Sequence, residues 1–92
     1  SSSYIREYDM VGVVIDYDPE TKLAKVVQKN RFFQGSRVEF LRPVGKFFAQ
    51  TIEEIYDENG TVLTVANRPQ SIVYVRTEQP VEPDTFLRMS RN

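Results

Sequence analysis

Two apolar runs on either side of a proline turn decide the fold of this chain, in residues 10–28, which read MVGVVIDYDPETKLAKVVQ. Both runs, residues 10–17 and 23–28, are rich in β-branched side chains, which pack well on the pleated surface of a strand. Between them, Pro19 is preset for a turn, and the carboxylate of Asp18 can bond the backbone ahead of it. The stretch therefore predicts a β-hairpin.

The rest of the chain repeats this pattern, with turn signals about every eight to twelve residues, as in all-β domains. Residues 46–55 are ambiguous, because Phe48, Ile52 and Ile55 also fit a helical stripe. We expect a strand there, since the DENG sequence at residues 57–60 is a hairpin signal. The further predicted strands are residues 37–41, 61–66, 72–76 and 85–89.

A set of short strands, without a helix long enough to cover an open sheet, is most simply satisfied if the sheet closes on itself. We therefore predict an all-β fold, a small closed or nearly closed antiparallel β-barrel of about six to seven short strands. The 92 residues are enough for one core and too few for two. Residues 1–7 are predicted to be a linker or a remnant of cloning, and residues 8–92 the single barrel domain.

Missing residue types narrow the chemistry that this chain can perform. It has no cysteine and no histidine, which excludes thiolate nucleophiles, Ser/His/Asp triads and the common zinc sites. Two carboxylate pairs, Asp16 with Asp18 and Asp57 with Glu58, fall at predicted hairpin tips, where they serve turns and stay solvated. We therefore expect no catalytic, cofactor-binding or metal-binding residue.

Charge is unevenly distributed, although the formal net charge is only -1. Residues 22–46 hold seven lysines and arginines against one glutamate, a balance of +6, whereas residues 47–85 have a balance of -5. Either the exposed faces of neighbouring strands attract one another, or the basic segment forms a patch for a polyanion. The residues expected to contact a polyanion are Lys25, Lys29, Arg31, Arg37 and Arg42.

Phe32 and Phe33 lie between positive charges and could either stack on nucleic-acid bases or fill the barrel. A barrel this small needs large side chains inside, and Phe32, Phe33, Phe40, Phe47 and Phe48 carry most of its aromatic volume. We expect at least one of Phe32 and Phe33 in the core, which leaves at most one for stacking.

Four longer stretches have a familiar order: VGVVIDYDPETKLAKVVQKNRFFQGSRVEF at residues 11–40, QTIEEIYDENG at 50–60, ANRPQSIVYV at 66–75 and PVEPDTFLR at 80–88. Together they resemble the C-terminal domain of the collagenase-like peptidase family U32. Three residues depart from the family pattern, all in turns or loops. Ser36 replaces an aspartate, Lys22 a turn glycine, and Arg68 a histidine before proline.

The resemblance implies a barrel similar to the second domain of translation elongation factors, appended to a larger protein. In the family, the signature motif with its cysteines belongs to a large N-terminal portion, so no catalytic residue can be carried over. Some relatives are linked to hydroxylation of tRNA or ribosomal RNA.

We therefore predict a non-catalytic C-terminal accessory domain that docks on, or presents substrate to, its own N-terminal catalytic domain. The alternative is an RNA-binding module of an RNA-modifying relative, which uses the basic segment 22–46. The expected further partners are RNA or a protein substrate. No apolar run approaches the ~20 residues of a membrane span, so we expect no membrane partner and a cytoplasmic location.

Overall fold

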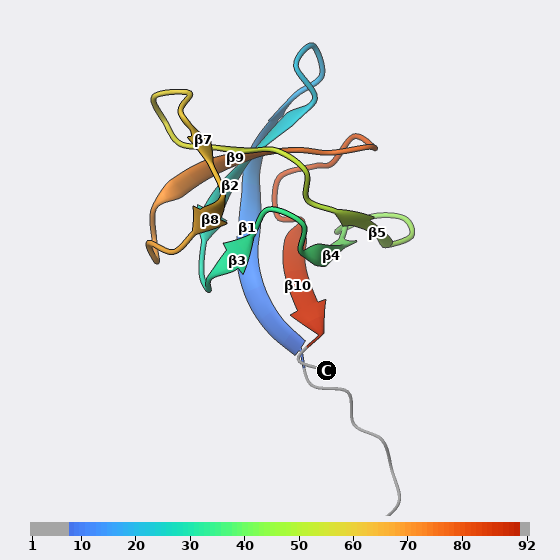
Figure 1. Cartoon of the computed structure of the whole chain (residues 1–92). Coiled ribbons are helices and arrows are strands. Elements are labelled where there is room, and N and C mark those ends of the chain that lie inside the picture. Colours follow the sequence, from blue (N-terminus) through green and yellow to red (C-terminus); the bar gives the residue numbers. More distant parts are fainter. Residues whose placement is uncertain (1–7, 91–92) are drawn as a thin grey trace, which may run out of the picture.

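The computed structural model describes residues 8–90, which form strands, turns and loops without a helix (Figure 1). The predicted linker at residues 1–7 lies outside the described residues. Within residues 8–90 there is accordingly no helix of the length and hydropathy that would cross a membrane. The strands are β1 (Tyr8–Asp18), β2 (Leu23–Gln28), β3 (Phe32–Phe33), β4 (Arg37–Leu41), β5 (Phe48–Thr51), β6 (Ile55–Tyr56), β7 (Val62–Leu63), β8 (Val65–Ala66), β9 (Ile72–Arg76) and β10 (Phe86–Ser90).

Eight strands form one antiparallel sheet in the order β5-β4-β10-β1-β2-β9-β6-β7, and β3 pairs with β8 in a separate ribbon. The predicted hairpin is at the centre of the sheet, where β1 and β2 pair from Gly12 opposite Gln28 to Asp18 opposite Leu23. Figure 1 shows β10 alongside β1 on its other side. The six strands longer than two residues are within the predicted number of six to seven. The prediction of one continuous strand at residues 61–66 is wrong, because a bend at Thr64 divides it into β7 and β8, which pair in different sheets.

The sheet closes because the chain leaves one edge of the sheet after β5 and, a few residues later, pairs with β9 near the other edge. β5 pairs with β4, and the chain then runs through Ile52 into β6, which pairs with β9. The Ile52 amide donates to the Ser36 carbonyl at 2.8 Å, and two residues later the Glu54 carbonyl accepts from the Arg76 amide at 3.3 Å. β4, β10, β1, β2, β9 and the β5–β6 segment therefore form a closed circuit. The predicted small antiparallel β-barrel is confirmed.

β5 and the end of β9 are not joined by a backbone ladder, and the side chain of Gln50 supplies hydrogen bonds between them. Gln50 is 3% exposed. Its Nε2 donates to the Arg76 carbonyl at 2.9 Å, and its Oε1 accepts from the Glu78 amide at 2.7 Å. A buried amide thus closes the seam of the barrel, since unpaired backbone groups inside a protein are costly.

The core lies inside this circuit. Phe40 stacks on Phe48 with ring centroids 4.9 Å apart. Gly12 faces Val26, and a Cβ at position 12 would come within 2.5 Å of Val26 Cγ1, so glycine is what permits this close packing. The buried apolar residues are Val11, Val14, Ala24, Val26, Phe32, Val38, Phe40, Ile52, Ile55, Ala66, Val73, Val75, Val81 and Leu87.

Of the five phenylalanines that carry most of the aromatic volume, two lie outside the barrel. Phe33 is 48% exposed because successive strand residues face opposite sides and Phe32 takes the inward position. Phe47 is 56% exposed because it precedes β5, in the loop that follows β4. The expectation that at least one of Phe32 and Phe33 is in the core is confirmed. The ambiguous segment 46–55 is strand only in β5 and in the first residue of β6.

We predict that Gln50→Ala lowers the free energy of unfolding by about 2 kcal/mol, because it removes both hydrogen bonds of a buried amide, to the Arg76 carbonyl and the Glu78 amide. In a domain of this size that lowers Tm by roughly 10 °C. Gln34→Ala is the matched control, since its Nε2 also bonds a carbonyl, that of Glu53, but at an exposed position. Thermal unfolding followed by circular dichroism measures both. Equal losses in the two variants would contradict the role given to Gln50.

Candidate functional site

The five residues predicted to contact a polyanion do not form one patch. Lys25 lies in the middle of β2, opposite Asp16 of β1 and Tyr74 of β9. Arg37 is exposed at the start of β4. Arg42 follows β4 and is held by a carboxylate. Only Lys29 and Arg31 come together, in the segment that connects β2 to β3.

Arg42 forms a two-point ion pair with Glu82. Its Nε donates to Oε1 at 3.0 Å and its Nη2 to Oε2 at 2.5 Å, with both side chains partly buried. The hydrogen bond from Arg42 holds the pKa of Glu82 below its ordinary value, and the same bond raises the pKa of Arg42. Arg42 therefore ties the end of β4 to the segment before β10 and is not available to a ligand.

A buried glutamine brings two distant segments together at one end of the barrel. Gln28, the last residue of β2, is 1% exposed. Its Nε2 donates to the Ala66 carbonyl at 2.6 Å, and its Oε1 accepts from the Arg68 amide at 3.3 Å. Its own amide donates to the Ser71 carbonyl at 2.9 Å. Residues 28–31 are thereby fixed beside the loop that joins β8 to β9.

Three cations lie on these two segments, and the exposed ring of Phe33 follows on β3. Lys29 Nζ donates to Gln70 Oε1 at 3.4 Å, which links the segments at their surface. The Arg31 guanidinium lies 5.7 Å from the centroid of the Phe33 ring, within the range of a cation–π contact. Arg68 extends from the β8–β9 loop. We call this region, made of Lys29, Arg31, Phe33 and Arg68, the basic end of the barrel.

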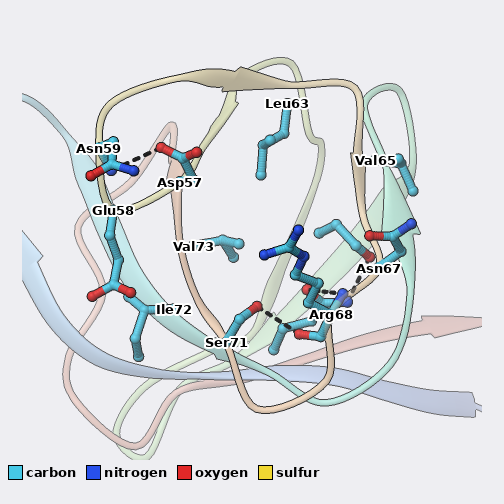
Figure 2. Close-up of a pocket in the computed structure, with 12 residues that line it drawn as sticks. Asp57, Glu58, Asn59, Leu63, Val65, Asn67, Arg68, Ser71, Ile72 and Val73 are labelled. Carbon is cyan, nitrogen blue, oxygen red and sulfur yellow. Dashed lines mark hydrogen bonds between the residues drawn. The ribbon is translucent and has the colours of Figure 1, made fainter.

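A hollow of about 410 Å³ adjoins the basic end. The apolar residues that line it are Leu63, Val65, Ile72 and Val73. Figure 2 shows the Arg68 side chain extending into the space between the β6–β7 hairpin and the β8–β9 loop. The opposite rim carries the polar residues of the hairpin tip, Asp57, Glu58 and Asn59.

Arg68 is not among the residues that the sequence predicts to contact a polyanion. It lies outside the basic segment 22–46, so a balance of charge along the chain could not find it. Gln28 brings Arg68 close to Lys29 and Arg31, and its long-range hydrogen bonds cannot be recognised from a local sequence pattern. Lys25, Arg37 and Arg42, which that balance did include, lie elsewhere on the barrel.

One member of each carboxylate pair serves a turn, as expected from the sequence, whereas Asp16 lies within β1, opposite Lys25. Asp18 Oδ1 accepts from the Glu20 amide at 2.9 Å, and Asp57 Oδ1 accepts from the amides of Asn59 and Thr61 at 2.8 and 2.9 Å. Among residues 8–90, no three carboxylates gather as a metal site would require. Tyr56 donates to Glu54, and this bond raises the pKa of the Tyr56 hydroxyl.

A second surface lies on the outer face of the sheet, where apolar residues stand side by side on five adjacent strands. Cross-strand pairing runs from Leu41 on β4 through the other members in turn, each directly opposite the next. Two further apolar side chains flank this row, Ile15 at 43% exposed and Met10 at 44% exposed. We call the row the apolar belt, and its members are Leu41, Phe86, Val13, Val27 and Ile72.

Comparisons with known proteins agree with one another. The sequence profile of the peptidase family U32 C-terminal domain matches residues 6–88. Two crystal structures of the C-terminal domain of a U32-family protein from Geobacillus thermoleovorans superpose with TM-scores of 0.83 and 0.82. Their sequences are 41% and 40% identical, and the matches cover 87% and 90% of this chain and 98% and 92% of theirs.

A curated relative is the "tRNA hydroxylation protein P1" of Bacillus subtilis (strain 168). It is 37% identical over 84 residues, which cover 91% of this chain. The chain spans about a fifth of the length of that relative, since the match covers 20% of it.

We predict that Glu82→Gln lowers Tm at neutral pH and that this loss disappears in acid. The pKa of Glu82 is lowered in the folded state, so its pair with Arg42 stabilises the fold above the ordinary value of 4.5 and ceases to do so as the pH falls through the folded pKa. Once the pH is below the folded-state pKa of Glu82, wild type and variant should converge. Thermal unfolding across this pH range tests it, with Glu20→Gln, a turn residue, as control. If the Tm of Glu82→Gln stays below that of the wild type in acid, the loss comes from packing and not from the ion pair.

Proposed function

Because the chain belongs to the peptidase family U32 C-terminal domain family, we propose that it is a non-catalytic accessory domain that docks on the rest of its parent protein and presents substrate to it. The C-terminal domain is not the catalytic part of U32-family proteins. The observation that carries the docking role is the apolar belt.

The belt has the properties of an interface and not of a surface adapted to water. Antiparallel sheets with one solvated face usually alternate apolar residues inside with polar residues outside. Here Phe86 is 41% exposed, and its neighbours across the strands, Val13 and Leu41, are apolar too. The other four members of the belt are half-buried, and a contiguous apolar surface that water still reaches is typical of sites of protein association.

The partner that we propose for the belt is the remainder of the parent protein. The curated relative is about five times as long as its matched part, so most of such a protein lies beyond this domain. A partner joined to the domain is present at high effective concentration, and a modest apolar surface is then sufficient to hold the two together. Burial contributes about 25 cal/mol for each Å² of apolar area covered.

We predict that Phe86→Ala weakens association between this domain and the parent protein lacking it by at least about tenfold, because a central aromatic anchor is lost. Isothermal titration calorimetry measures the affinity. Phe33→Ala is the matched control, since Phe33 is exposed to a similar extent but lies on β3, outside the belt. No association of the wild-type domain, or self-association of the isolated domain through the belt, would reject this docking role.

A second candidate function is RNA binding, and it is favoured by two observations. A relative carries a name that refers to tRNA hydroxylation. The basic end gathers Lys29, Arg31 and Arg68 beside the exposed Phe33 ring, which is the combination of cations and aromatic faces that single-stranded nucleic acids bind. With a net charge of -1, the domain depends on this local concentration of charge to attract a polyanion.

We predict that the domain binds single-stranded RNA with an affinity that falls roughly 20-fold between 50 and 200 mM salt, as about three neutralised phosphates require. Phe33→Ala should weaken binding about tenfold by removing one stacking face. Phe86→Ala, an exposed phenylalanine of the belt, is the control and should have no effect. Fluorescence anisotropy with a labelled oligoribonucleotide measures all three. No binding even at low salt would remove this candidate.

A further inference from the structure

We propose that the hollow beside Arg68 binds one unpaired nucleotide of a single-stranded RNA, whose neighbour stacks on Phe33. This inference rests on the RNA-binding function proposed above and specifies its site. It assigns a role to the hollow that adjoins the basic end.

The hollow has the size and the lining of a nucleotide site. Its volume of about 410 Å³ falls within the usual range of small-ligand pockets. Leu63, Val65 and Ile72 are partly exposed apolar residues of its lining, so that a base can contact branched aliphatic side chains. This part of the lining is fixed by strands, since β7, β8 and β9 contribute these residues.

Residues of opposite charge line two sides of the hollow, Arg68 on one side and Asp57 and Glu58 on the other. Arg68 extends into the hollow (Figure 2), and no ion pair within residues 8–90 engages its guanidinium. Its backbone is held, because the amide bonds Gln28 and the carbonyl accepts from Ser71 Oγ at 2.6 Å. The guanidinium is thus a positioned donor for a phosphate, with a fork geometry that suits it.

The far rim offers acceptors to a base. Asp57 Oδ1 is already used by two backbone amides, whereas Glu58 lies next to it on the rim of the hollow. A carboxylate only accepts hydrogen bonds. Guanine presents two adjacent N–H donors on its pairing edge, which a carboxylate can receive together, so we infer a preference for guanine in the hollow.

The neighbouring site is continuous with the hollow. Phe33 pairs directly with Val65 across the β3–β8 ribbon, and Val65 also lines the hollow. Adjacent strands are about 4.8 Å apart, so the ring and the hollow are within reach of successive nucleotides. Arg31, over the ring, is placed to contact the phosphate between them.

The test compares cation variants of the isolated domain. Arg68→Ala should weaken binding of a fluorescein-labelled UUGUU pentaribonucleotide about tenfold by anisotropy at low salt. Arg37→Ala removes an exposed cation on β4 that does not line the hollow, and should change the affinity less than about twofold. In two-dimensional NMR spectra of the wild type, the RNA should shift the amides of residues 63–73. Glu58→Gln should reduce the preference for UUGUU over UUUUU.

The outcomes separate the inference from the function on which it rests. If the wild-type domain binds neither oligonucleotide, RNA binding itself is rejected. If it binds both, but Arg68→Ala and Arg37→Ala have equal effects and the amides of residues 63–73 do not shift, RNA binding stands and the hollow is not its site. Thermal unfolding of each variant confirms that its fold is retained.

Discussion

Closure of the sheet around a single core depends on satisfying backbone groups where neighbouring strands separate. Two buried glutamines do this at two places on the barrel, Gln50 between β5 and the end of β9, and Gln28 between β2 and the β8–β9 loop. A glutamine amide is suited to the task because it has both a donor and an acceptor, and its length spans a gap that backbone alone cannot. Within the described residues, no buried side-chain nitrogen or oxygen is left without a partner.

The position of the basic end follows from the second of these seams. Lys29 and Arg31 are 37 or more residues from Arg68 along the chain, and the bonds of Gln28 bring their segments together, with a further surface contact between Lys29 and Gln70. The geometry of the proposed binding region is thus fixed by a buried amide and not by the cations, which would repel one another if nothing else held them. A polyanion would relieve that repulsion, which is why such an arrangement favours one.

Much of the fold could be predicted from the sequence, because alternation and turn chemistry act locally. The hairpin at residues 10–28 and the strands near residues 37–41 and 72–76 are where the pattern placed them. The candidate site was only partly predictable. A balance of charge along the chain ignores which face a strand residue occupies, so it grouped Lys25 and Arg42 with Lys29 although pairing separates them. Likewise, the split of Phe32 and Phe33 follows from their adjacency in a strand, but which one faces inward depends on the pairing of β3 with β8.

The two proposed surfaces meet at one residue, and this connects docking with presentation of substrate. Ile72 ends the apolar belt on β9 and also lines the hollow beside Arg68. A protein that covers the belt as far as β9 would therefore stand at the edge of the hollow, and a nucleotide held there would lie at the boundary between the two. Because Leu63 and Ile72, which line the hollow, lie on the same sheet that carries the belt, docking would fix the orientation of the bound nucleotide toward the partner. By orienting the substrate toward its partner, an accessory domain without catalytic residues of its own would contribute to a reaction that the partner performs.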